Sequence, residues 1–73
     1  MTEEVVTEIV ELELPFGRRA ILKNVAFEGG LNMLRLTLRE GRRFTIMDLD
    51  AASAKAFGQA MADWADKNAN GSN

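Results

Sequence analysis

The chain has 73 residues, of which 47% are hydrophobic and 27% charged, with a formal net charge of -2. This length allows one domain, whose single small core provides little net stability by itself. The sequence contains no cysteine and no histidine. It therefore excludes disulfides, thiolate or imidazole metal ligands and histidine-activated nucleophiles, and leaves dimerisation as the ordinary means of reinforcing the fold.

The charges are unevenly distributed along the chain. Five glutamates occupy the first strand region: Glu3, Glu4, Glu8, Glu11 and Glu13. Seven basic residues follow in the next three strand regions: Arg18, Arg19, Lys23, Arg35, Arg39, Arg42 and Arg43. The start of the sequence is acidic, and no apolar run approaches the length of a membrane span. We expect no secretory signal, no membrane anchor and a cytoplasmic location.

Residues 5–14 predict a first strand with an irregularity near its middle. Val10, Leu12 and Leu14 alternate with glutamates, whereas Val5 and Ile9 belong to the opposite phase. Either a bulge near Ile9 or a frayed start of the strand would reconcile the two phases. The segment Pro15-Phe16-Gly17 then predicts a turn, because proline lacks the amide hydrogen a ladder needs and glycine tolerates positive φ.

Residues 19–28 predict a second strand, in which Ile21, Val25 and Phe27 are in phase and Lys23 interrupts them. Gly29-Gly30 ends this strand and starts the return. Residues 31–38 predict a third strand with leucines at even positions, and a fourth strand follows after Gly41. Strand order is expected to follow sequence order.

The third and fourth strands predict a β-hairpin. Phe44 and Ile46 share the even phase of Leu34 and Leu36, so a three-residue loop over residues 39–41 places Leu36 opposite Phe44. The same register places Met33 opposite Met47 on the other face of the hairpin. It predicts one apolar face and one face of arginine, methionine and threonine.

Asp50 predicts the N-cap of a C-terminal helix, because its carboxylate can accept from the free amides of the first turn. Phe57, Met61 and Trp64 form an apolar stripe at helical spacing. We expect this stripe to lie across the Leu/Phe/Ile face of the sheet. A second stripe consists of small residues: Ala54, Gly58, Ala62 and Ala65.

The fold class is therefore α+β: a four-stranded antiparallel meander sheet with one C-terminal helix packed on one face, in the order ββββα. Residues 1–67 are expected to form the single domain. The composition of residues 68–73 predicts a disordered tail.

Catalytic and metal sites are poorly supported by the sequence. Asp48 and Asp50 have a spacing seen in divalent-ion loops, but ending a strand and capping a helix account for both. Ser53 has no base except Lys55, which lies on another helical face. We expect no enzymatic activity, no metal, no cofactor and no small-molecule substrate.

The face of arginine and methionine is the strongest candidate for a contact site, since both residue types are enriched at protein interfaces. Its residues are Met33, Arg35, Arg39, Arg43 and Met47. The helix residues Ala54, Gly58 and Ala62 are the candidates for self-association. The first hypothesis is a protein-interaction or accessory module that acts through homodimerisation or a partner protein.

A single-stranded nucleic-acid-binding module that uses the arginine-rich open face is the alternative. A curved four-stranded sheet followed by a helix resembles small single-strand-binding coactivator domains, and such sheets combine basic grooves with aromatic rings. Exposed aromatic residues are scarce in this prediction, and the net charge is negative. Pairing of Glu11 and Glu13 with Arg18, Arg19 or Lys23 would neutralise part of the surface.

Three short runs carry a resemblance to a known family: residues 30–35, residues 39–45 and residues 48–51. They resemble a group of short uncharacterised proteobacterial proteins classed as a domain of unknown function. The resemblance covers about the last two thirds of the chain and rests on turn, strand and cap residues. It implies a bacterial cytoplasmic protein, and it assigns no activity, ligand or functional residue.

Overall fold

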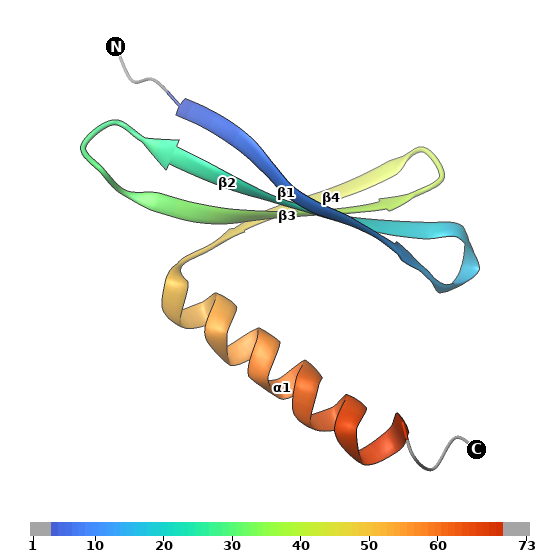
Figure 1. Ribbon diagram of the computed structural model, residues 1–73. Coiled ribbons are helices and arrows are strands. Elements are labelled where there is room, and N and C mark those ends of the chain that lie inside the picture. Colours follow the sequence, from blue (N-terminus) through green and yellow to red (C-terminus); the bar gives the residue numbers. More distant parts are fainter. Residues whose placement is uncertain (1–3, 70–73) are drawn as a thin grey trace.

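A computed structural model describes residues 4–69 as one antiparallel sheet followed by one helix (Figure 1). The strands are β1 (Glu4–Leu14), β2 (Arg18–Phe27), β3 (Asn32–Glu40) and β4 (Arg43–Leu49). They are arranged in the order β1-β2-β3-β4, and each neighbouring pair is antiparallel. The helix α1 (Ala51–Ala69) follows β4. The predicted ββββα meander is confirmed.

The connections form where the sequence predicts them. The turn η1 (Pro15–Gly17) joins β1 to β2, and Phe16 adopts φ 66° within it. Gly29 and Gly30, at φ 96° and 93°, connect β2 to β3. The register of β1 against β2 shifts between Glu8 and Val10, which confirms the predicted bulge at Ile9.

The predicted register of the second hairpin is wrong. Glu40 pairs with Arg43, so the loop has two residues, and Leu36 lies opposite Met47 rather than Phe44. Gly41 has φ 58°, and a glycine with positive φ at the first loop position suits a two-residue hairpin turn. Both phases of β4 contain apolar residues, so alternation alone does not select a register.

The register gives the sheet two chemically different faces. One face, called the inner apolar face, consists of Val10, Leu12, Leu14, Ala20, Leu22, Leu34, Leu36, Leu38, Met47 and Leu49. The other, called the outer face, carries most of the charged residues together with Val25, Met33, Phe44 and Ile46. In the observed register, Met47 and Leu49 of β4 share a face with the leucines of β3. Phe44 and Ile46 lie on the other face.

Little of the described chain is buried. Val25 is fully buried and Ala20 is 7% exposed, while Thr37 is the buried polar residue at 9%. Val25 lies in the ladder between Val6 on β1 and Met33 on β3, on the outer face near the end of β2. The protein is flat and elongated, with extents of 53 × 30 × 15 Å.

The helix begins at the predicted cap. The backbone N–H of Ser53 donates to Asp50 Oδ1 at 2.8 Å, and the N–H of Ala54 donates to the Asp50 carbonyl at 2.9 Å. The helix continues to Ala69, two residues beyond the predicted domain end at residue 67. Of the predicted tail, residues 70–73 lie outside the described residues, as do residues 1–3 of the predicted domain.

The apolar stripe of α1 is not covered by the sheet, which corrects the predicted packing. Phe57, Met61 and Trp64 are 51%, 63% and 67% exposed. The helix approaches β3 and β4 at its start, where Ala54 is half-buried, and then diverges from the sheet (Figure 1). Asp50 alone separates β4 from α1, so the short connection sets the direction of the helix. Within residues 4–69, no helix combines the length and hydropathy that a membrane span requires.

Candidate interaction surfaces

The inner apolar face presents continuous apolar rows across the sheet. Val10, Leu22, Leu36 and Met47 form one row, with one residue from each strand. Leu12 at 46% and Met47 at 39% are the more exposed members, and Leu22, Leu34, Leu36 and Leu38 are half-buried. A sheet face with this composition normally packs against another layer.

The two predicted helix stripes form a single apolar side of α1. Positions three and four apart share a helix face, so Phe57, Met61 and Trp64 border the small residues Gly58 and Ala65. Lys55, Gln59, Asp63 and Asp66 lie on the opposite side, while Asn68 follows the apolar stripe in the last turn and donates to the Trp64 carbonyl at 2.9 Å. Gln59 donates to Asp63 at 3.1 Å along that polar side. The helix is amphipathic, and no layer of the described residues covers the large side chains of its apolar side.

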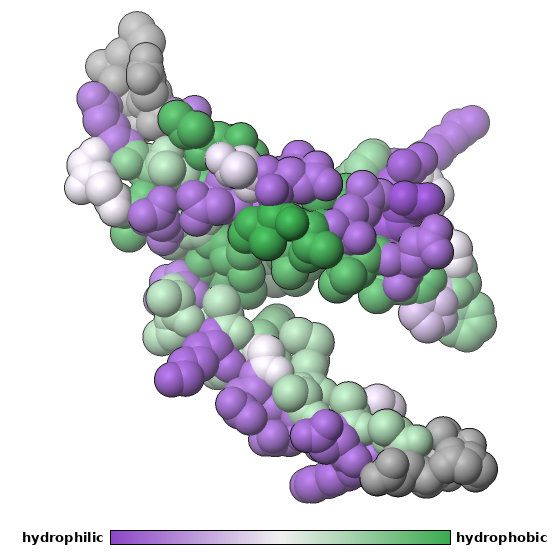
Figure 2. Space-filling view, viewed as in Figure 1, coloured by the Kyte–Doolittle hydropathy of each residue, from purple (hydrophilic) through white to green (hydrophobic). Residues whose placement is uncertain are grey.

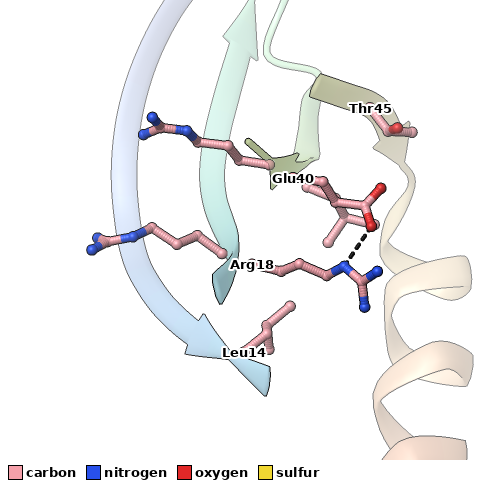
Figure 3. A pocket seen from close by; sticks show the side chains of 7 residues that line it. Leu14, Arg18, Glu40 and Thr45 are labelled. Carbon is pink, nitrogen blue, oxygen red and sulfur yellow. Dashed lines mark ion pairs between the residues drawn. The ribbon is translucent and has the colours of Figure 1, made fainter. Parts of the chain in front are cut away.

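The inner apolar face and the apolar side of α1 enclose an open cleft. Figure 2 shows hydrophobic atoms on the side of the sheet that faces the helix, with empty space between the two. Figure 3 shows Arg18, Glu40 and Thr45 pointing to the side of the sheet on which α1 runs. These residues lie on the inner apolar face as well, because each is an even number of residues along its strand from an inner residue or pairs directly with one.

The rim of the inner apolar face holds a shallow pocket near the two hairpin turns. It has a volume of about 320 Å³ and is lined by Leu14, Arg18, Arg19, Leu38, Arg39, Glu40 and Thr45. Arg18 Nε and the Glu40 carboxylate form an ion pair across it (Figure 3). Because its charged lining is already paired in part, the pocket is a polar border of the apolar surface.

The outer face carries a charged row at its centre. Arg35 Nε lies 2.8 Å from Asp48 Oδ1, and Arg35 Nη2 lies 3.0 Å from Asp48 Oδ2. Glu4 approaches the same guanidinium at 4.0 Å. The hydrogen bonds from Arg35 lower the pKa of the Asp48 carboxyl and raise the pKa of Arg35. Arg35 is therefore engaged within the chain.

Arginines gather at the end of the sheet where both hairpin turns lie. Arg19 pairs with Glu11 at 2.5 Å and with Glu13 at 3.6 Å, as the sequence predicts, and the Glu11 hydrogen bond raises the pKa of Arg19. The Arg18 guanidinium lies 5.7 Å from the centre of the Phe16 ring. The Arg39 guanidinium lies 5.8 Å from the centre of the Phe44 ring.

Three arginines at this end keep unpaired charge. Among residues 4–69, Arg39, Arg42 and Arg43 have no acidic side chain within ion-pair distance. Phe16, in the other hairpin turn at this end, is 89% exposed, and Phe44 is 56% exposed. The structure thus exposes an aromatic ring that the predicted register placed on the covered face.

The predicted contact set does not form one surface. Met33, Arg35 and Arg39 lie on the outer face, whereas Arg43 and Met47 lie on the inner side. The predicted self-association residues Ala54, Gly58 and Ala62 do lie along α1, and they adjoin its large apolar residues. The sequence prediction missed the inner leucine rows as an exposed surface, since it assigned them to a core under the helix.

The two aspartates considered as a metal pair serve the local structure. Asp48 accepts both hydrogen bonds from Arg35 on the outer face. Asp50 caps α1, and hydrogen bonding from Ser53, chiefly from its side chain, lowers the pKa of the Asp50 carboxyl. Within the described part of the chain, no cluster of three or more metal-ligating side chains is formed.

The fold and surfaces define the protein as a small ββββα chain with an open sheet and an unpacked amphipathic helix. The model of the Family of unknown function (DUF6967) matches residues 3–67, so the chain belongs to that family. No curated protein and no solved structure is significantly similar to the chain. The predicted domain of unknown function is confirmed, whereas the proteobacterial origin stays a prediction.

Proposed function

We propose that this protein is a non-enzymatic protein-interaction module. One observation carries the proposal: the inner apolar face and the apolar side of α1 face each other across an open cleft. Phe57, Met61 and Trp64, on the apolar side of α1, are more than half exposed. Small folded proteins rarely leave large contiguous apolar surfaces in water unless these surfaces bind something.

The chemistry of the cleft favours a protein chain as its occupant. Its walls combine leucine, methionine and aromatic side chains, which dominate the buried centres of protein interfaces. Charged residues such as Arg18 and Glu40 lie at its border, where interfaces are polar. The proposal includes the cytoplasmic location expected from the sequence, which cell fractionation tests.

A site-specific photocrosslinking amino acid tests this function in cells that express the full chain. At position 57, on the apolar side of α1, we expect covalent adducts to protein. At position 59, on the polar side of the same helix, we expect few or none. Adducts with a second copy or with another protein both support an interaction module. Equal yields at both positions, or no adduct at position 57, overturn it.

Single-stranded nucleic-acid binding is the second candidate function. The observation that favours it is the end of the sheet with both hairpin turns, which carries Arg39, Arg42 and Arg43 together with the exposed rings of Phe16 and Phe44. Guanidinium groups and aromatic rings together are what single-strand binders use for phosphates and bases. The ion pairs of Arg18 and Arg19 reduce the charge available.

Fluorescence anisotropy with a labelled mixed-sequence single-stranded oligonucleotide tests the second candidate. Binding that weakens steeply with salt and is lost in Arg42→Glu/Arg43→Glu supports it, because counterion release accompanies phosphate contacts. The matched control is Lys55→Glu on the polar side of α1, which should leave that binding unchanged. Absence of binding at low salt excludes this candidate.

A further inference from the structure

We propose that the occupant of the cleft is a second copy of this chain, and that each copy inserts its α1 between the sheet and the helix of the other. This inference rests on the proposed function and names its partner. The result is a two-fold symmetric dimer in which the inner apolar face of each sheet is covered by the partner's helix.

The amount of exposed surface supports a dimer of this size. The chain exposes 5906 Å², whereas a folded monomer of its mass, 8.1 kDa, is expected to expose about 4500 Å². The excess is about 1400 Å² per copy, or about 2800 Å² for a pair, which lies within the range of obligate homodimer interfaces. The radius of gyration of 14.7 Å likewise exceeds the value of about 11 Å expected for a compact chain of this length.

The short connection between β4 and α1 favours packing of α1 on the partner's sheet over packing on its own sheet. Asp50 is the one residue between the two elements, and its side chain and carbonyl are both engaged by the first helical turn. Just before it, Asp48 is held by Arg35 on β3. With both sides of the connection held, only the backbone dihedral angles of Leu49 and Asp50 can redirect α1, so the short connection favours the observed direction of the helix.

The shape of α1 matches the cleft that it would enter. Its 19 residues correspond to a length of about 28 Å, comparable to that of the strands it would cross. The large side chains Phe57, Met61 and Trp64 can cover the partner's leucine rows. Gly58 lies on the same side of the helix, and within residues 4–69 nothing outside the helix's own backbone lies within 4 Å of a Cβ added there, so the partner's helix has room to approach.

Sedimentation equilibrium of the purified full chain at micromolar concentration is the first test. We expect a mass twice the 8.1 kDa of one chain. A mass of 8.1 kDa overturns the homodimer. If the chain is a monomer, the photocrosslinking experiment at position 57 still tests the proposed function by itself. Adducts with other proteins would then support an interaction module that is not a homodimer.

The exchange itself is tested by isotope-filtered nuclear Overhauser measurements on a mixture of ¹³C-labelled and unlabelled copies. We expect contacts between Trp64 ring protons of one copy and leucine methyl groups of the other. A dimer that lacks these intermolecular contacts overturns the exchange of helices.

A pair of helix variants gives a separate check on the interface. Met61→Glu places a charge in the buried interface and should weaken dimerisation by at least about tenfold. Gln59→Glu places the same charge on the polar side of α1 and should leave the dimer intact. Both substitutions are at exposed positions in the chain, so the folding of the monomer is preserved. Equal dimerisation of the two variants contradicts the proposal.

Discussion

Arg35 and Asp48 face each other across β3 and β4 and are joined by two parallel hydrogen bonds of 2.8 and 3.0 Å. This bidentate geometry is the strongest form of side-chain ion pairing, because two donors of a planar group meet two acceptors. The pair also marks the register, since a shift of one residue would move Asp48 to the opposite face. It therefore fixes the hairpin immediately before the helix connection.

The pair predicts a dependence of stability on acid pH. The pKa of Asp48 in the folded chain lies below its ordinary value of 3.8, so its contribution is present above that value and is lost as the pH falls through the lower folded pKa. Asp48→Asn should lower the melting temperature near neutral pH. The difference from wild type should be constant near neutral pH and should shrink as the pH falls below about 4.

Thermal unfolding followed by circular dichroism, from neutral pH into the acid range, measures the effect of Asp48→Asn. Asp66→Asn is the control, because no basic side chain within residues 4–69 pairs with Asp66. A melting-temperature difference for Asp48→Asn that stays constant with pH would contradict the role of the ion pair.

Removal of the helix cap at Asp50 is expected to destabilise α1 selectively. Asp50→Ala removes the acceptor for the Ser53 N–H and should reduce the ellipticity at 222 nm. Asp50→Asn retains a side-chain oxygen and should preserve most of the helix. Hydrogen exchange is the more specific measurement, since faster exchange should be confined to the first turns of α1. Equal spectra for the alanine and wild-type chains would show that the cap does not limit helix formation.

Val25 is expected to be the most sensitive position in the sheet. Val25→Ala should lower the free energy of unfolding by about 2 kcal/mol, because it removes two fully buried methyl groups. Val5→Ala, at a position 62% exposed, should change it by less than about 0.5 kcal/mol. Urea titrations of both variants measure the two values. Similar losses for both would mean that the outer face has no core at Val25.

Replacement of Phe16 is expected to stabilise the protein. Its φ of 66° is unfavourable for a bulky side chain, and the ring is 89% exposed. Phe16→Asn should raise the free energy of unfolding by up to about 1 kcal/mol, since asparagine tolerates this conformation. The same titration measures it. A loss of stability would show that the contact between Phe16 and Arg18 outweighs the strain.

Local signals in the sequence determined the elements of this fold. Asp50 marked the helix start, Pro15-Phe16-Gly17 and Gly29-Gly30 marked the turns, and the phase change around Ile9 marked the bulge. Each of these signals acts over a few residues, through backbone hydrogen bonds or allowed φ values. Sequence order likewise gave the order of the strands, because short connections keep consecutive antiparallel strands adjacent.

The tertiary structure decided which residues share a surface. In β4, Phe44 and Ile46 are as apolar as Met47 and Leu49, so only pairing with β3 selected the phase that faces the leucines. It also decided that α1 leaves the sheet, because the direction of a helix depends on its connection and not on its own amphipathic pattern. Local patterns set which residues form strands and helix. Long-range pairing and the single-residue connection at Asp50 set which apolar surfaces stay open.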